Sequence, residues 1–187
     1  MTERTLWHMI VTLDAVTPAV WRSLLVQPDI KLAKLHRYLQ VAMGWDEMHL
    51  FEFRIKGQSY GIPDPELRIK MYDARRYPLN RLFSKPIGSF TYHYDFGDNW
   101  THTIKLDGVQ LAVPRARYPI CTDGSGPCPP EDCGGVPGYE SLRSTLRDPS
   151  DPEHEEMRAW AEMQGYPRHF SARAATSMMR DIDRGWR

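Results

Sequence analysis

Cysteine is scarce in this sequence, and neither sign of charge is in excess. The 187 residues include three cysteines, and 24 lysines and arginines balance 24 aspartates and glutamates. A small, odd number of cysteines argues against a secreted disulfide framework, so we expect a cytoplasmic protein with reduced thiols. Dedicated nucleic-acid binders usually carry a basic excess, because phosphate neutralisation dominates their affinity. A neutral chain argues against that class unless it has a local basic patch.

Long apolar runs are also missing. The sequence has no run of about 18 apolar residues, so we expect no membrane span. Its first residues lack the apolar core of a signal peptide. The length suits a single domain over 1–187, with a core over about 5–138 and C-terminal helices over about 139–184.

Regular side-chain patterns are present in the first third of the chain. Apolar and polar residues alternate over 6–13 and 51–55, and β-forming residues fill 20–26, which predicts three strands. Between them, apolar residues at helical spacing predict a helix over 30–43. Gly44 is suited to end this helix in the left-handed conformation.

Aromatic residues concentrate in the middle of the chain. The alternation over 90–96 and 100–106 predicts a hairpin with a three-residue turn that sets Tyr94 opposite His102. We choose this turn because a two-residue turn would shift the pairing by one residue and place Thr101 and Thr103 on the aromatic face. Helical patterns follow over 139–146, 152–163 and 170–182. The predicted class is therefore α+β, with a mixed or antiparallel sheet, a hairpin–helix–strand N-terminal half and a C-terminal helical portion.

All three cysteines lie in a segment rich in proline and glycine, residues 119–140. Such a segment suits neither a helix nor a central strand, so we interpret it as an ordered loop that something holds in place. Zinc bound by Cys121, Cys128 and Cys133, with His102 as fourth ligand, would form a closed structural site. Two alternatives stay open: the cysteines pack as buried thiols, or Cys121 and Cys133 form a disulfide.

Carboxylates and an imidazole gather around the predicted turn. Asp95, Asp98 and His102, with Glu131 and Asp132 of the loop, could hold a divalent ion for phosphodiester hydrolysis or form an acid–base pair. We favour a structural interpretation, because Asp98 is typical of turns and His102 lies on an apolar face. Asp95, Asp98 and His102 are thus catalytic candidates that lack a reaction-specific pattern.

The most basic stretch is 66–85, where six lysines and arginines accompany two acids. We interpret it as a solvated surface segment. The alternative is contact with nucleic acid through Arg68, Lys70, Arg75, Arg76 and Arg81. Elsewhere, we expect His36 to be a buried, hydrogen-bonded imidazole; the alternative is a function shared with His49. For Trp21-Arg22 we expect a strand residue and a neighbour whose charged end reaches solvent; the alternative is a cation–π or interface element.

Three groups of residues resemble the signatures of the plasmid pRiA4b ORF-3-like protein family, over roughly residues 5–165. The first group is Pro18, Trp21-Arg22, Leu35-His36, Met43-Gly44-Trp45 and His49-Leu50. The second is Tyr92, Tyr94-Asp95-Phe96-Gly97-Asp98, Trp100 and His102. The third is Cys121, Cys128-Pro129-Pro130-Glu131-Asp132-Cys133-Gly134-Gly135 and Gly138-Tyr139-Glu140. One departure is Ser23, where the family commonly has a second arginine.

The resemblance implies a compact α+β domain found on plasmids, in insertion-sequence passengers and in bacterial chromosomes. Some relatives carry a resolvase-like label, but this chain shows no recombinase nucleophile context. We therefore predict a non-catalytic binding or accessory module of mobile-element origin, whose Cys/Pro/Gly loop could hold a structural metal, with zinc as the candidate. The alternative is a metal-dependent enzyme acting on nucleic acid through Asp95, Asp98 and His102.

Overall fold

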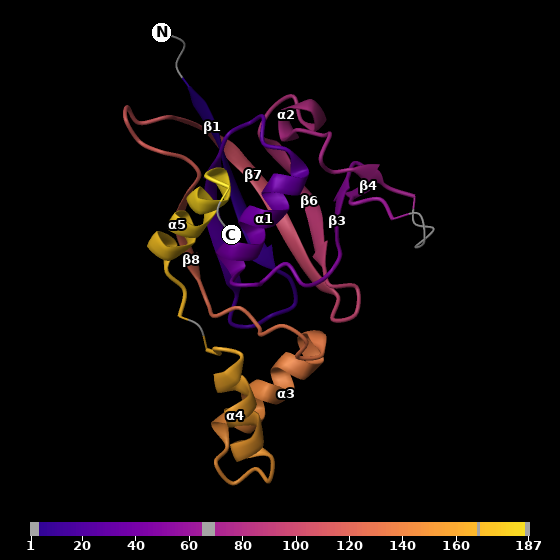
Figure 1. Ribbon diagram of the computed structural model, residues 1–187, viewed down its shortest axis with the longest axis vertical. Coiled ribbons are helices and arrows are strands. Elements are labelled where there is room, and N and C mark those ends of the chain that lie inside the picture. Colours follow the sequence, from indigo (N-terminus) through magenta and orange to yellow (C-terminus); the bar gives the residue numbers. More distant parts are fainter. Residues whose placement is uncertain (1–3, 65–69, 168, 186–187) are drawn as a thin grey trace.

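One twisted sheet forms the centre of the computed structural model, which describes residues 4–64, 70–167 and 169–185 (Figure 1). Its strands are β1 (Thr5–Leu13), β2 (Val20–Val26), β3 (Phe51–Ile55), β4 (Gln58–Gly61), β5 (Tyr72–Asp73), β6 (Ile87–Tyr94), β7 (Trp100–Leu111) and β8 (Ile120–Ser125). Within the described residues they lie in the order β5-β4-β3-β6-β7-β1-β2-β8. Neighbouring strands are antiparallel except β4 and β5, which are parallel.

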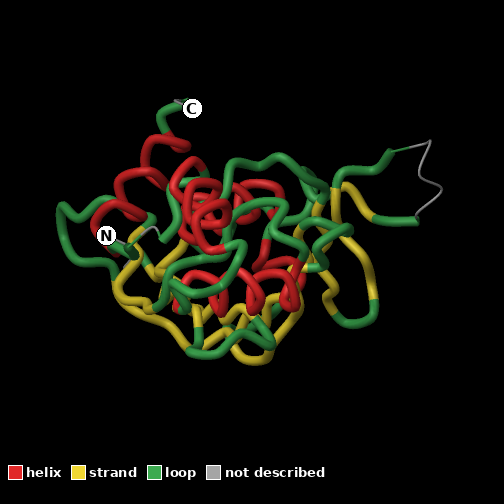
Figure 2. The backbone as a smooth tube through the Cα atoms, turned by 90° about the horizontal axis from the view of Figure 1, so that it is seen from below, coloured by secondary structure: helices red, strands yellow, loops and turns green. Residues whose placement is uncertain are grey.

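Helices cover one face of the sheet and extend beyond one end. They are α1 (Leu32–Met43), α2 (Leu79–Leu82), α3 (Gly135–Arg147), α4 (His154–Met163) and α5 (Ala172–Asp183). α1 and α5 pack together on one face, and no helix of the described residues covers the other face (Figure 2). α3 and α4 form a hairpin that projects from the end of the sheet (Figure 1). These elements confirm the predicted α+β class. No helix in the described ranges is long and apolar enough to cross a membrane.

The aromatic hairpin keeps its predicted face but has a longer turn. β6 and β7 pair with Tyr94 opposite Trp100, so the turn comprises residues 95–99. The predicted pairing of Tyr94 with His102 is wrong by two positions, because Asp95 takes a positive φ of 55° and leaves the ladder. A shift of two residues keeps every side chain on its own face. Phe90, Tyr92, Tyr94 and Trp100 are therefore buried as predicted, whereas Phe96 falls in the longer turn and is 41% exposed.

The segment over 119–140 is not a loop throughout. Its first part is β8, an edge strand beside β2 that we did not predict from its turn-rich sequence. α5 covers this edge: Thr176 Oγ1 accepts from the Cys121 N–H at 2.9 Å and donates to the Cys121 carbonyl at 3.2 Å. At the other end, α3 begins at Gly135, earlier than predicted. Gly134 precedes it with φ 87°, and a proline is tolerated in the first turn of a helix.

Arg22 on β2 is buried, with 1% of its surface exposed, so the expectation that its charged end reaches solvent is wrong. Its guanidinium donates to the carbonyl oxygens of Ala42 at 2.7 Å and Ser125 at 2.8 Å, and it lies over the Phe170 ring at 4.1 Å. These contacts satisfy a buried cation. They also connect the end of α1 to the point where β8 passes into the 126–134 loop.

His36 is buried as predicted. Its ring stacks on Phe51 with centroids 3.7 Å apart and an angle of 9° between the planes. Its Nδ1 forms a hydrogen bond of 2.8 Å with the hydroxyl of Tyr92, which also accepts from Gln40 Nε2 at 2.9 Å. The imidazole is therefore part of the core between α1 and the sheet.

Candidate metal centre

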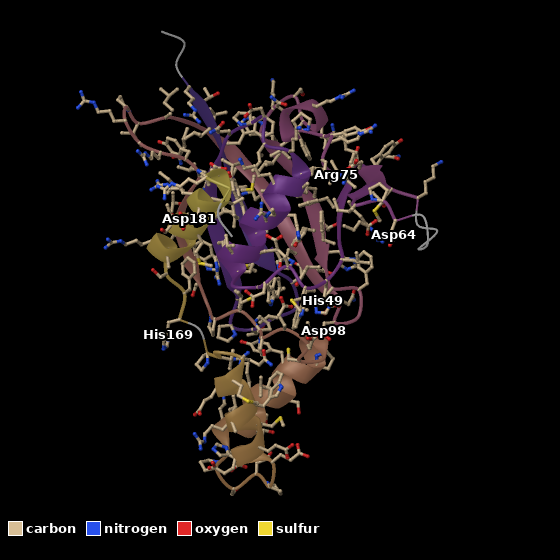
Figure 3. All side chains as sticks on the ribbon, viewed as in Figure 1. His49, Asp64, Arg75, Asp98, His169 and Asp181 are labelled. Atoms are coloured by element: carbon tan, nitrogen blue, oxygen red, sulfur yellow. The ribbon has the colours of Figure 1, made fainter. Side chains whose placement is uncertain are left out.

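Three segments that are far apart in the sequence meet at one end of the sheet. They are residues 44–50 after α1, residues 95–99 between β6 and β7, and the 126–134 loop. Trp45 Nε1 donates to the carbonyl of Pro129 at 3.0 Å, and the Gly134 N–H donates to Asp98 Oδ2 at 3.1 Å. Figure 3 shows His49 and Asp98 near each other at this end, beside the start of α3. The loop is thus attached to the aromatic hairpin.

Unusual backbone conformations position the carboxylates of this junction. Asp95 and Asp132 have φ angles of 55° and 54°. This left-handed conformation costs a residue with a Cβ about 1–2 kcal/mol, and aspartate tolerates it because its side chain can bond locally. Asp95 Oδ1 does so by accepting from the Gly97 N–H at 2.9 Å. Strained backbone of this kind is common at functional sites.

An imidazole and three carboxylates converge at the junction. His49 Nε2 lies 3.1 Å from Asp132 Oδ1, 3.6 Å from Asp95 Oδ2 and 4.0 Å from Glu131 Oε2. Ligand atoms of His49, Asp95 and Asp132 all lie within 4.8 Å of one another. Two ligands of a tetrahedral ion with bonds of about 2.1 Å are about 3.4 Å apart. The cluster therefore has the spacing of a metal site before any ion is placed in it.

Two polar atoms at the centre of this cluster lack hydrogen bonds. Glu131 Oε1 accepts from the Tyr94 hydroxyl at 2.8 Å and from the Asp46 N–H at 3.1 Å. Glu131 Oε2 and His49 Nε2, in contrast, are buried atoms without a hydrogen-bond partner. The 3.1 Å approach of His49 Nε2 to Asp132 is an ion-pair distance without hydrogen-bond geometry. The two unpaired atoms lie 4.0 Å apart, close enough for one cation to contact both.

The carboxylates of this cluster outnumber the basic side chains around them. Among the described residues, His49 is the one basic side chain within 4.0 Å of any of these carboxylates. Burial raises the pKa of Glu131, because the ionised carboxylate is poorly solvated there. The side chain of Asp95 is 8% exposed and that of Asp132 is 71% exposed. The cluster is therefore closed on its inner side and open to solvent at Asp132.

The structure separates the three predicted catalytic residues. Asp98 accepts the Gly134 N–H, so its carboxylate holds the loop. His102 is fully buried; its Nδ1 lies 3.3 Å from the Tyr92 carbonyl, and burial lowers its pKa to about 3. Asp95 does meet an imidazole, but it is that of His49.

The predicted cysteine ligands do not gather. Cys121 and Cys128 are buried, Cys133 is partly buried, and no disulfide joins these residues, which all belong to the described chain. No three ligand atoms of the cysteines and His102 lie within 4.8 Å of one another. Burial raises the pKa of Cys121 to about 11 and that of Cys133 to about 12, whereas zinc binds the thiolate. Zinc at the cysteines stays a prediction.

The basic residues that were predicted to contact nucleic acid do not belong to this junction. Arg68 falls outside the described residues, while Lys70, Arg75, Arg76 and Arg81 are exposed near the β5 edge of the sheet.

Sequence reasoning missed His49 as a candidate ligand. It lies in the irregular segment between α1 and β3, where no periodicity assigns a direction to its side chain. Its place in the first of the three signatures, beside Trp45, was the available indication. The structure adds that the first signature supplies His49, the second supplies Asp95, and the third supplies Glu131 and Asp132.

The fold and this junction define an α+β protein with a carboxylate–histidine cluster at the end of a mostly antiparallel sheet. The chain belongs to the plasmid pRiA4b ORF-3-like protein family, whose model matches residues 6–174. It is 41% identical over 157 residues to the uncharacterised protein y4hQ of Sinorhizobium fredii strain NBRC 101917 / NGR234, covering 83% of this chain and 80% of that protein. It is also similar to the crystal structure of the protein of unknown function MM3350 from Methanosarcina mazei Go1. That match has a TM-score of 0.81 and 29% identity, and it covers 92% of this chain and 98% of the other.

Proposed function

We propose that this protein is a metal-dependent binding module in which a divalent cation joins the 126–134 loop to the aromatic hairpin. His49, Asp95, Glu131 and Asp132 would bind the cation. The observation that carries the proposal is the convergence of His49, Asp95 and Asp132, whose ligand atoms lie within 4.8 Å of one another. The family's plasmid-derived name supports an accessory role for the module in a mobile element.

The donor set indicates the kind of ion. One imidazole nitrogen and carboxylate oxygens suit a divalent first-row transition metal, because imidazole favours zinc or iron and carboxylates favour manganese or magnesium. Such an ion would pair with Glu131 Oε2 and His49 Nε2, the two buried atoms that lack hydrogen bonds. Its positive charge would also offset the negative charge of the three carboxylates, which have His49 as their one basic neighbour among the described residues. Zinc and manganese are therefore the ions to test.

Titration calorimetry of metal-free protein with Zn²⁺ and with Mn²⁺ tests this proposal. We expect one equivalent of at least one ion to bind, and His49→Gln or Asp95→Asn to weaken binding at least about tenfold, because each removes a ligand. His93→Gln is the matched control, since it removes an imidazole from β6 outside the cluster. Loss of binding in Cys133→Ser, with His49→Gln unaffected, would move the site to the cysteines. Absence of binding by both ions would contradict the proposal.

A metal-dependent enzyme is the second candidate function. The observation in its favour is the 71% exposure of the Asp132 side chain, which would leave coordination positions open to water or substrate. The metal-loaded protein can be assayed with a phosphodiester substrate. Turnover that disappears in Asp95→Asn would favour the enzyme, and no turnover with intact metal binding would favour the module.

A further inference from the structure

The β5 edge of the sheet carries positive charge that the proposed metal site does not use. Over residues 56–64 and 70–85, six lysines and arginines accompany two aspartates. Asp73 is the ion-pair partner of both Arg75, at 2.8 Å, and Arg76, at 3.7 Å. Arg81 is exposed, and its guanidinium lies 5.5 Å from the centre of the Tyr77 ring. One carboxylate thus serves two guanidinium groups, while the third has an aromatic neighbour.

Three tyrosines pack together at the same edge. The Tyr60 and Tyr72 rings are 5.4 Å apart, and Tyr77 lies 5.1 Å from Tyr60 and 5.5 Å from Tyr72. Tyr60 is buried, whereas Tyr72 is 45% exposed. The Tyr72 ring is therefore held by two aromatic partners and still presents a surface to solvent. The periodicity of the sequence did not indicate this cluster, because β4 and β5 are separated along the chain and pair in the fold.

We infer that Tyr72, Arg75, Arg76 and Arg81, together called the tyrosine–arginine edge, bind single-stranded nucleic acid. One base stacks on Tyr72, and the guanidinium groups contact the phosphates beside it. An exposed aromatic ring next to basic side chains is the combination that single-strand binders use. A duplex fits less well, because its bases are already stacked on one another and are not available to the ring. The inference does not depend on the metal site.

The open face of the sheet is less suited to this partner. Its charged side chains neutralise one another: Arg54 pairs with Glu52 at 2.9 Å, Lys105 with Asp107 at 2.8 Å, and His8 with Asp107 at 3.4 Å. Phosphate binding there would have to displace these pairs. At the tyrosine–arginine edge, Arg75 and Arg76 share the single carboxylate of Asp73, and Arg81 lies beside the Tyr77 ring, so phosphate would exchange with one carboxylate for three guanidinium groups.

Fluorescence anisotropy with a labelled oligothymidine of about 12 nucleotides tests the inference, in EDTA so that metal binding plays no part. We expect the full chain to bind at about 50 mM salt and to weaken towards about 200 mM. Tyr72→Ala should weaken binding at least about fivefold, while Tyr72→Phe keeps the stacking surface and should bind like the wild type. Arg81→Gln should reduce the magnitude of the salt slope by about 0.7, the value for one phosphate contact on a single strand.

Two substitutions elsewhere serve as matched controls. Phe96→Ala removes an aromatic ring that is 41% exposed at the hairpin turn, and Arg173→Gln removes an exposed arginine from α5. Both should bind the oligonucleotide like the wild type. Equal weakening in these variants, equal affinity for a duplex, or no binding at low salt would overturn the inference. Binding of polyglutamate in place of the oligonucleotide would assign the edge to an acidic protein and would also overturn it.

Discussion

At the scale of single residues, two of the buried polar atoms that lack a hydrogen-bond partner lie in the candidate site. Among the described residues, four buried side-chain atoms lack a hydrogen-bond partner: His49 Nε2, Trp100 Nε1, His102 Nε2 and Glu131 Oε2. Leaving such an atom unpaired costs about 1–3 kcal/mol. His49 Nε2 and Glu131 Oε2 lie 4.0 Å apart, so a single cation would serve both. On this proposal, the empty site would destabilise the fold and the filled site would stabilise it.

Glu131→Gln should have effects of opposite sign on stability and on metal binding. The amide oxygen keeps the bonds from Tyr94 and Asp46, while the new NH₂ group faces His49 Nε2 and removes one negative charge. We expect the metal-free variant to gain about 1 kcal/mol of unfolding free energy and to bind metal at least about tenfold more weakly. Thermal unfolding in EDTA and in excess Mn²⁺ measures both. A variant that is destabilised in EDTA but keeps its metal affinity would contradict this account.

At the scale of elements, the site depends on how closely the loop approaches the hairpin. A Cβ at Gly135 would lie 2.4 Å from the Asp98 carbonyl oxygen, and a Cβ at Gly138 would lie 1.9 Å from that of Cys133. Both neighbours are backbone atoms that cannot rotate away. Arg22 holds the other end of the same loop through the carbonyl of Ser125. The loop is thus fixed at both ends, which positions Glu131 and Asp132 without secondary structure of their own.

Gly135→Ala should weaken metal binding because the added methyl group pushes the loop away from Asp98. Gly57→Ala is the matched control: its φ of 74° is close to the 67° of Gly135, but nothing lies within 4 Å of the added Cβ. Both variants should lose about 1 kcal/mol from backbone strain. Only Gly135→Ala should also lose metal affinity in calorimetry. Equal affinity in the two variants would show that loop position does not matter to the site.

At the scale of the whole molecule, two neutral histidines are built into the core. Burial lowers the pKa of both His36 and His102 to about 3. In the unfolded chain each has a pKa of about 6.5. Between these values the unfolded state binds more protons than the folded state. The stabilisation is therefore complete above about pH 6.5 and is lost as pH falls towards the folded pKa.

The free energy of unfolding should therefore fall as pH is lowered from about 6 to about 4. Two histidines together give a slope of about 2.7 kcal/mol per pH unit, to which the carboxylates add their own effect. His36→Gln removes one of the two protons and should lessen the slope by about 1.4 kcal/mol per pH unit. Urea unfolding at several pH values measures this difference. The same slope in wild type and variant would mean that His36 is not buried in its neutral form.

The element pattern and the α+β class followed from the sequence because they depend on local periodicity. The expected ranges 20–26 and 51–55 match β2 and β3, and the helix expected over 30–43 differs from α1 only at its start. Predictions failed where a long-range contact decides the conformation. β8 forms in a turn-rich segment because β2 and α5 supply partners on both sides. Arg22 is buried because carbonyl groups from other elements surround its guanidinium.

The candidate site, too, was predicted in part from the sequence and decided in part by long-range contacts. The sequence by itself grouped Asp95, at the end of the predicted 90–96 strand, with Asp98 and His102 and with Glu131 and Asp132 of the loop. Tertiary structure replaced His102 with His49, because His102 alternates inward into the aromatic core while His49 follows an irregular segment with no period of its own. Periodicity determines which way a side chain points along one element. Where three elements meet in space is determined by packing and by long-range hydrogen bonds, which only the folded chain supplies.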